Sequence, residues 1–254
     1  MVHFVGAGPG AADLITVRGK DLLGKADVVI YAGSLVNPEL LKYTKKEARI
    51  YNSAEMTLEE VLEVMIKAEA NRLDVVRLHT GDPSIYGAVR EQMDLLAAKG
   101  IAYDSCPGVS ACFGAAASLN MEYTLPGISQ TLIITRMEGR TKVPVGESIE
   151  SLSSHKASMA IYLSAGMLKE LSDKLTAGGY DADTPAAIVY KATWPEERKV
   201  YCTIGTLAQA GEKEGIKNLA VILIGDAVSQ SGYDRSRLYA PEFTTGFRKG
   251  TEDD

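Results

Sequence analysis

The sequence predicts an α/β protein with two α/β domains and largely parallel or mixed sheets, and three observations support this prediction. Short apolar runs alternate with helical patterns through most of the 254 residues, which is typical of βαβ units. The first apolar run, residues 2–5, leads directly into the glycine-rich turn Gly6-Ala7-Gly8-Pro9-Gly10, as expected of a buried strand with a tight exit. The alternation loosens at Pro126-Gly127 and then resumes. We therefore expect domains at residues 1–122 and 123–230, followed by a surface extension at 231–254 with a disordered tip.

Capping signals define the helices of the first half. Thr16 is expected to cap a helix over residues 16–24, and Asn37 with Pro38 to open another that ends at residue 43. Thr57 and Glu60 form a capping box before a longer helix. The remaining expected elements are strands at 27–32, 74–79 and 101–105, a helix at 85–99, and a small, alanine-rich helix at 110–119.

The second half repeats the alternation without a detectable short repeat. Expected strands cover residues 131–135, 158–163, 186–190 and 219–224, with helices at 147–153, 167–177 and 206–213. From Ser229 onward the chain is polar and lacks periodicity, so we expect the extension to lie on the surface.

Composition excludes several classes of protein. The hydrophobic fraction is 46% and the charged fraction 24%, with neither a long apolar run nor a signal-peptide pattern, so we expect a cytoplasmic protein without a membrane partner. The net charge of −6 disfavours a general nucleic-acid surface. The three cysteines show no CxxC spacing and the three histidines no HxxxH pair, so no metal site is expected.

The first turn also fits a different ligand. Gly6-x-Gly8-x-x-Ala11 satisfies the relaxed dinucleotide fingerprint. Against NAD, Pro9 lies inside the motif, residues 11–15 delay the next helix until about Thr16, and no acidic ribose partner follows the second strand. The motif alone therefore leaves open a nucleotide-type pocket and a tight strand exit without a ligand.

Four turns at strand ends stand out together, at residues 6–10, 80–83, 107–110 and 191–195. Ligands in open α/β sheets bind beyond the carboxyl ends of the strands. An ordinary connection explains any one of these turns, but it explains the set less well. We expect such turns from two domains to face one cleft.

The motifs Gly6-Ala7-Gly8-Pro9-Gly10, Thr80-Gly81-Asp82-Pro83-Ser84-Ile85-Tyr86-Gly87 and Pro107-Gly108-Val109-Ser110-Ala111 together resemble the tetrapyrrole methyltransferases of corrin and sirohaem synthesis. The resemblance spans about residues 1–248 and implies the class III fold, S-adenosylmethionine (SAM) as methyl donor, S-adenosylhomocysteine as product, and a homodimer. Segments 31–36, 135–141, 190–195 and 236–239 resemble the branch that methylates C11 of precorrin-4 or cobalt-precorrin-4 in cobalamin biosynthesis. Residues 80–87 favour the cobalt-containing route.

The resemblance also implies a cofactor site. Two of its positions depart from the pattern common in relatives, because Thr80 replaces a glycine and Leu163 a methionine. Asp82 is the best candidate for a polar contact to the ribose or amino group of SAM, and it also suits the cap of a helix that begins near Ser84. The residues expected to bind the cofactor are Pro9, Thr80, Gly81, Asp82, Ile85, Ser110, Ala111, Leu163 and Ala192.

A polycarboxylate tetrapyrrole needs basic donors. Arg136 and Arg140, which flank Glu138, are the first candidates, followed by Lys191 and by Trp194, whose flat face suits the macrocycle. Methyl transfer mainly requires alignment and exclusion of water, so we assign no catalytic residue and interpret His79 as a strand-end histidine. The alternatives are another tetrapyrrole position, diphthine as substrate, a NAD-type oxidoreductase, and a ligand-binding protein without turnover.

Overall fold

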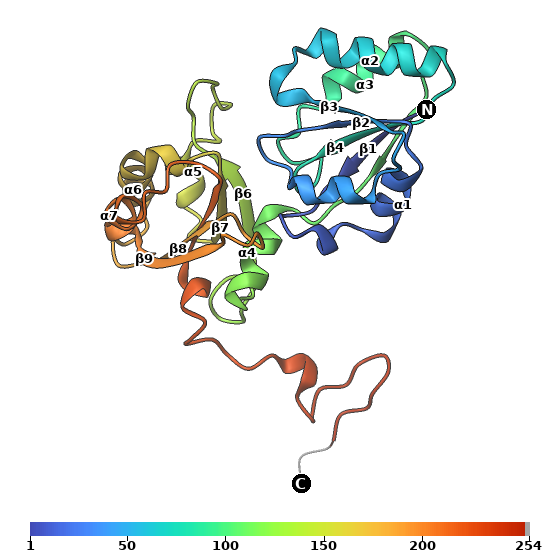
Figure 1. Ribbon diagram of the computed structural model, residues 1–254. Coiled ribbons are helices and arrows are strands. Elements are labelled where there is room, and N and C mark those ends of the chain that lie inside the picture. Colours follow the sequence, from blue (N-terminus) through green and yellow to red (C-terminus); the bar gives the residue numbers. More distant parts are fainter. Residues whose placement is uncertain (252–254) are drawn as a thin grey trace. The chain divides into compact units, whose positions relative to one another are not determined.

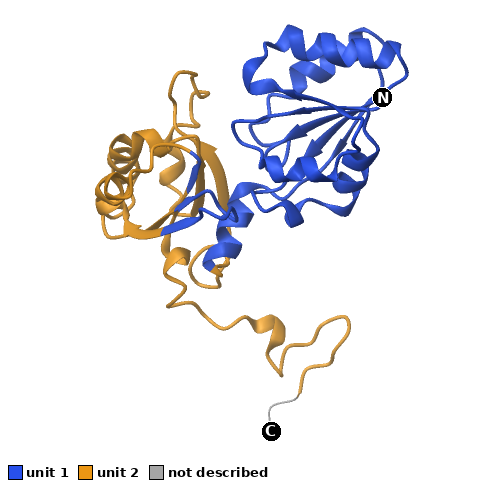
Figure 2. Cartoon of the chain, viewed as in Figure 1, with its two compact units in different colours: residues 1–119, 189–199, 219–221 blue, residues 120–188, 200–218, 222–254 orange. Residues whose placement is uncertain are grey.

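The structure is a computed structural model that describes residues 1–251 and contains two compact units (Figure 2). Unit 1 comprises residues 1–119, 189–199 and 219–221, and unit 2 comprises residues 120–188, 200–218 and 222–251. Each unit combines segments that are distant in the sequence. The domain boundaries expected after residues 122 and 230 stay predictions.

Unit 1 contains a five-stranded parallel sheet with β1 between β4 and β5. The strands are β1 (Val2–Gly6), β2 (Val28–Tyr31), β3 (Arg49–Asn52), β4 (Val75–His79) and β5 (Tyr103–Cys106), in the order β3-β2-β4-β1-β5. Because the strands are parallel, the turns after β1, β4 and β5 emerge at one edge of the sheet.

Helices cover both faces of this sheet (Figure 1). Val5 packs with α1 (Val17–Lys25) and the 3-10 helix η2 (Pro38–Tyr43), whereas its neighbour Phe4 packs on the other face with α2 (Leu58–Ala70) and α3 (Arg90–Ala98). The connections that follow the adjacent strands β1 and β4 therefore leave on opposite faces. Such a switch point is where open α/β sheets bind ligands.

The local capping signals are confirmed. Thr16 Oγ1 accepts a hydrogen bond from Gly19 N at 3.0 Å, and Thr57 and Glu60 form the expected capping box. The delay before α1 is also present, because residues Ala12–Leu14 form the short 3-10 helix η1.

The structure differs from the sequence predictions at two elements of unit 1. The helix expected at 85–99 begins only at Arg90, because Tyr86 (φ 54°) and Ala88 (φ 48°) are left-handed and Gly87 folds closely against Pro83. Strand β3, preceding the 3-10 helix η3 (Ser53–Glu55), was not expected, because its first two residues are exposed and form no apolar run.

The second sheet has the order β6-β7-β10-β8-β9 and is mixed. Strands β6 and β7 are parallel, whereas β7 and β10 are antiparallel. The chain is thus α/β in both sheets, as predicted. The strands are β6 (Leu132–Arg136), β7 (Ser158–Tyr162), β8 (Pro185–Tyr190), the unexpected β9 (Arg198–Thr203) and β10 (Ala220–Ile224). The helices between β5 and β10 are α4 (Ala111–Leu119) in unit 1 and, in unit 2, α5 (Ile149–Ser153), η4 (Ala165–Met167), α6 (Leu168–Ala177), η5 (Ile204–Thr206) and α7 (Leu207–Lys213).

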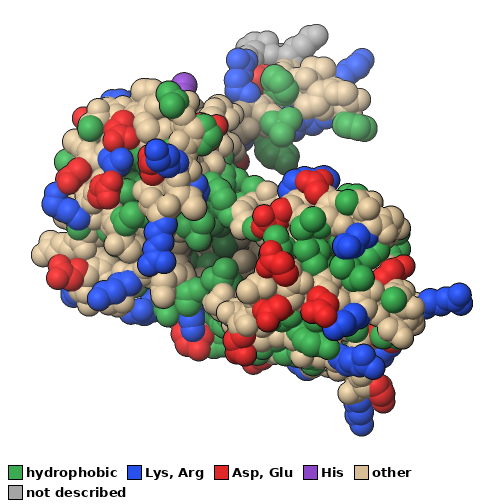
Figure 3. All heavy atoms as spheres, turned by 90° about the horizontal axis from the view of Figure 1, so that it is seen from above, with side chains coloured by type: hydrophobic (Ala, Val, Ile, Leu, Met, Phe, Trp, Pro, Cys, Tyr) green, Lys and Arg blue, Asp and Glu red, His purple; other side chains and the backbone are tan. Residues whose placement is uncertain are grey.

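After η6 (Asp226–Ser229), the described part of the C-terminal segment, up to residue 251, contains one further 3-10 helix, η7 (Arg237–Tyr239). The Arg248 guanidinium donates hydrogen bonds to the carbonyls of Leu238, Ala240 and Phe243 and so holds a local loop. Tyr239 and Phe247 are exposed on this segment, and apolar side chains are visible there in Figure 3. The expected disordered tip, which ends at Asp254, lies outside the described residues. No helix within residues 1–251 is long and apolar enough to cross a membrane.

Candidate functional site

Four glycines bring the turns after β1, β4 and β5 into backbone contact. A Cβ atom added at Gly6 would lie 2.6 Å from Gly108 Cα and 2.7 Å from Gly81 O. Gly8 and Gly81 are left-handed, with φ of 81° and 58°, and exchange two backbone hydrogen bonds of 3.2 and 2.9 Å. Only residues without a side chain permit this approach, so the sequence fixes the three turns against one another.

Asp82 links two of these turns. Its Oδ1 accepts hydrogen bonds from the amide and hydroxyl of Ser84, and its Oδ2 accepts one of 2.9 Å from Gly108 N. Burial by itself would raise the pKa of Asp82, but these hydrogen bonds bring it below its usual value. The carboxylate is therefore ionised at neutral pH and caps a turn instead of the helix that the sequence predicted near Ser84.

The first residues of α4 pack on the turn after β1. A Cβ atom at Gly114 would lie 2.5 Å from Pro9 Cβ. Ser110, directly before α4, is buried, and Ala111 is half-buried. Small residues therefore surround Pro9 on this side.

The loop after β8 supplies the fourth turn and also belongs to unit 1. Thr193 Oγ1 accepts a hydrogen bond of 3.0 Å from Ala11 N. A Cβ atom at Gly10 would lie 2.7 Å from Ala192 O and 2.5 Å from Trp194 Nε1, so the indole edge packs against Gly10. The four predicted turns are therefore connected within one unit.

The ammonium group of Lys191 lies over one face of the Trp194 ring. Lys191 Nζ lies 5.1 Å from the centroid of this ring and 3.7 Å from Glu196 Oε1. The ammonium group of Lys191 is thus partly neutralised, which weakens its case as a free donor for a substrate carboxylate.

The predicted cofactor residues fall into two groups. Unit 2 contains Leu163, which is left-handed (φ 55°) and 65% exposed after β7. Thr80 and Ile85 are half-buried on the loop that also carries Gly81 and Asp82. All the predicted cofactor residues other than Leu163 lie in unit 1, on the four connected turns: Pro9, Thr80, Gly81, Asp82, Ile85, Ser110, Ala111 and Ala192.

Arg136, in unit 2, holds a loop together. Its guanidinium donates to the carbonyls of Met137 and Thr141, both at 3.1 Å, and of Lys142 at 2.8 Å. Met137 N in turn donates to Ser164 Oγ at 3.0 Å. Met137 is buried, whereas Glu138 and Arg140, one and three residues further on, are exposed.

His79 is buried at the end of β4 and stacks on Phe4. Burial, together with the charge of nearby Arg77, lowers its pKa to about 3, so the imidazole is neutral. Its Nε2 has no hydrogen-bond partner among residues 1–251. These properties fit a core histidine better than a proton acceptor.

Sequence reasoning missed two residues of this site. Asn37 was recognised as a cap, and its Oδ1 does accept from Glu39 N, but its Nδ2 also donates to Gly10 O at 2.9 Å. Thr193 lies within residues 190–195, where the sequence gives no sign that sets it apart from its neighbours. Both contacts join segments that are distant in the sequence, for which no local pattern exists.

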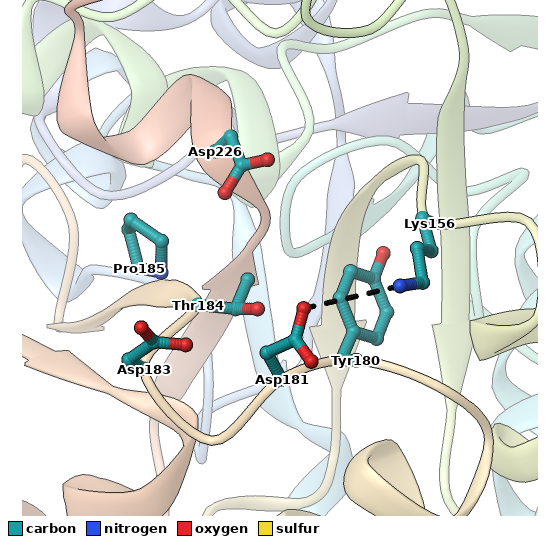
Figure 4. A pocket seen from close by; sticks show the side chains of 7 residues that line it. All are labelled: Lys156, Tyr180, Asp181, Asp183, Thr184, Pro185 and Asp226. Carbon is teal, nitrogen blue, oxygen red and sulfur yellow. Dashed lines mark ion pairs between the residues drawn. The ribbon is translucent and has the colours of Figure 1, made fainter.

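A separate pocket of about 340 Å³ lies in unit 2 and contains none of the predicted site residues (Figure 4). Lys156 and Asp181 face each other across it at 3.9 Å. Within residues 1–251 no group of three or more His, Cys, Asp or Glu side chains is placed to hold a metal ion. The full lining is Lys156, Tyr180, Asp181, Asp183, Thr184, Pro185 and Asp226.

Comparison with known proteins gives a consistent picture. The family model of the tetrapyrrole (corrin/porphyrin) methylases matches residues 1–208. A cobalt-precorrin-4 C(11)-methyltransferase from Methanocaldococcus jannaschii is 50% identical over 98% of this chain and 96% of its own length, and a precorrin-4 C(11)-methyltransferase from a Sinorhizobium species is 45% identical over 97% and 98%. A solved cobalt-precorrin-4 methyltransferase superposes with a TM-score of 0.87 at 44% identity, covering 89% of this chain and 95% of that one.

Two enzymes that act on uroporphyrinogen or uroporphyrin are less similar. A uroporphyrinogen-III C-methyltransferase from Bacillus subtilis is 30% identical over 90% of this chain and 91% of its own length. A uroporphyrin-III C-methyltransferase structure from Thermus thermophilus, complexed with S-adenosylhomocysteine, has a TM-score of 0.76 at 23% identity, covering 91% of this chain and 99% of that one.

Proposed function

The chain belongs to the tetrapyrrole (corrin/porphyrin) methylase family, and we propose that it transfers a methyl group from SAM to C11 of precorrin-4 or cobalt-precorrin-4 in cobalamin biosynthesis. The observation that carries the proposal is the similarity to C11-methyltransferases at 41–50% identity over nearly the whole chain, against 30% for the uroporphyrinogen enzyme. Family membership also favours a methyltransferase over the NAD-type oxidoreductase that the glycine motif alone permits.

The four connected turns suit SAM. SAM combines an adenosine, a methionine zwitterion and a cationic sulfonium, and the turns offer small side chains, backbone groups and the ionised Asp82. The S-adenosylhomocysteine bound in a structure of the same fold supports this choice. We propose that Pro9, Thr80, Gly81, Asp82, Ile85, Ser110, Ala111, Leu163 and Ala192 contact the cofactor.

When bound, SAM would supply an electrophilic methyl carbon: C11 would attack it in line, so that a C–C bond forms while the methyl–sulfur bond breaks and S-adenosylhomocysteine leaves. The residues of the chain have to hold the two reactants in register and exclude water, effects large enough to account for much of the rate. No side chain of this site is assigned as an acid or base, and the neutral, buried His79 is not needed as one.

We propose that the substrate carboxylates bind Arg140 and that Arg136, Glu138, Lys191 and Trp194 also contact the substrate. Arg140 is the strongest of these candidates because its guanidinium is exposed, whereas Arg136 already donates to three carbonyls. By the same resemblance, we propose a homodimer that acts in the cytoplasm; light scattering coupled to gel filtration would measure the mass in solution.

The decisive experiment is incubation of the protein with SAM and either form of precorrin-4. We expect a product that gains one methyl group by mass spectrometry, located at C11 by NMR. No such gain with either form would refute the assignment to C11. Titration with SAM and with NAD separates the two cofactor classes, and binding of SAM without any methylated product would identify a ligand-binding protein instead.

A further inference from the structure

The peptide group between Gly10 and Ala11 is held at both of its polar atoms by side chains. Asn37 Nδ2 donates to Gly10 O at 2.9 Å, and Ala11 N donates to Thr193 Oγ1 at 3.0 Å. Asn37 is buried, lies 26 residues after Ala11, and belongs to the start of η2, whereas Thr193 follows β8. With both groups bound, this peptide plane has one orientation.

We propose that Thr193, together with Asn37, is a positioning residue for SAM that acts by fixing the Gly10–Ala11 peptide and hence the neighbouring Pro9. This inference rests on the proposed function, since Pro9 is one of the expected cofactor contacts. Thr193 needs no contact with SAM in this role. It holds Pro9 and the Gly10–Ala11 peptide in the conformation that binds SAM before the cofactor is bound.

Thr193 itself is held in an uncommon conformation. It is left-handed with φ of 68°, and Lys191 two residues earlier is left-handed with φ of 46°. Such a conformation is unfavourable for a β-branched residue and persists only where surrounding contacts impose it. The loop therefore needs anchors on both sides of Ala192.

The anchors of Thr193 reach α4. Thr193 N donates to Glu197 Oε2 at 2.5 Å, and Glu197 Oε1 lies 3.3 Å from Lys199 Nζ. Lys199 Nζ also donates to Ser118 O near the end of α4. The backbone of Thr193 is thus connected through Glu197 and Lys199 to α4, the helix that packs on Pro9. These polar contacts help to place the Thr193 hydroxyl against Ala11 N.

The matched variants of Thr193 separate the hydroxyl from the methyl group. Thr193→Val keeps the shape and the methyl group that faces Gly114 but removes the acceptor for Ala11 N. Thr193→Ser keeps the acceptor. As a control for loss of any threonine hydroxyl in unit 1, Thr44→Val removes only a local bond to Leu41 O at 2.8 Å.

The readout is the dissociation constant for SAM from isothermal titration calorimetry, with the KM for SAM and kcat as second measurements. We expect Thr193→Val to weaken SAM binding about 5- to 10-fold, as for loss of one hydrogen bond and the preorganisation it gives. Thr193→Ser and Thr44→Val should stay within about twofold of the wild-type protein. The change should appear in the KM for SAM more than in kcat at saturating SAM.

Asn37→Ser tests the other bond without altering Thr193. A serine can still cap Glu39 N but is too short to reach Gly10 O. We expect it to weaken SAM binding by a similar factor, and the double variant to lose less than the sum of the two free-energy changes, because either change releases the same peptide.

Three results would overturn the inference. Thr193→Val could bind SAM as tightly as the wild-type protein, Thr193→Ser could be as weak as the valine variant, or the two single changes could prove strictly additive. If the valine variant does not fold, the Asn37→Ser and Thr193→Ser results still decide. Failure of the wild-type protein to bind SAM would instead refute the proposed function, and the positioning role with it.

Discussion

Substitution of Gly6 by alanine tests whether the three turns of the site depend on direct backbone contact. The added Cβ would lie 2.6 Å from Gly108 Cα and 2.7 Å from Gly81 O, and ordinary contact begins at 3.4 Å. The backbone must therefore separate by about 0.8 Å (3.4 minus 2.6). Both neighbours are main-chain atoms of hydrogen-bonded turns, so we expect a loss of about 2–3 kcal/mol in the free energy of unfolding.

For a chain of this size that loss corresponds to a fall in melting temperature of about 4–12 °C, measured by calorimetry. Two other glycines provide controls. Gly100→Ala adds a methyl group in open space but at φ of 69°, so only a backbone cost of about 1 kcal/mol is expected. Gly24→Ala, within α1 and 3.4 Å from Tyr43 O, should be neutral or stabilising. If Gly6→Ala melts no lower than Gly100→Ala, the contact is not what selects glycine there.

Three further predictions concern single side chains. The pKa of His79 is about 3 in the folded chain and about 6.5 in the unfolded chain, so protonation below pH 6.5 favours the unfolded chain. The free energy of unfolding of the wild-type protein should therefore be about 2 kcal/mol lower at pH 5 than above pH 6.5. His79→Phe should not show this decrease, and urea unfolding at each pH would measure both. Asp82→Asn should lower the melting temperature by about 2–4 °C and weaken SAM binding, since an amide nitrogen cannot accept a hydrogen bond from Gly108 N. A melting temperature and a dissociation constant for SAM that are both unchanged, as measured by calorimetry, would contradict this. Arg140→Ala should weaken tetrapyrrole binding about tenfold and leave SAM binding unchanged, and fluorescence titrations that show equal losses would remove it from the substrate surface.

Sequence reasoning located elements where a local pattern carries the information. Thr16, and Thr57 with Glu60, cap their helices as expected because an N-cap interaction lies within three residues. It failed at the loop after Asp82, where Tyr86 and Ala88 are left-handed although neither residue type signals it. It also missed β3, whose pairing with β2 depends on the partner strand more than on its own half-exposed residues.

The candidate site was predictable in part for a related reason. Glycines at strand ends indicated which turns matter, and the resemblance to a family grouped them. The connections between the turns were not predictable, because Asn37 and Thr193 reach Gly10 and Ala11 from segments 27 and 182 residues away. The role of Arg136 was likewise hidden: a basic residue in a loop does not reveal that its guanidinium faces carbonyls of its own loop.

The glycine motif at residues 6–11 has the spacing of a dinucleotide-binding site, but its glycines have a different role in this chain. In a dinucleotide fold the glycines bring the pyrophosphate to the N-terminus of the next helix. Here Gly6 packs on Gly108, and Gly8 pairs with Gly81. The short helix η1 separates the turn from α1, whose first turn is capped by its own Thr16. The helix N-terminus is therefore not offered to a phosphate at this turn, and the glycines instead bring three turns together in an arrangement that suits a cofactor without phosphate groups.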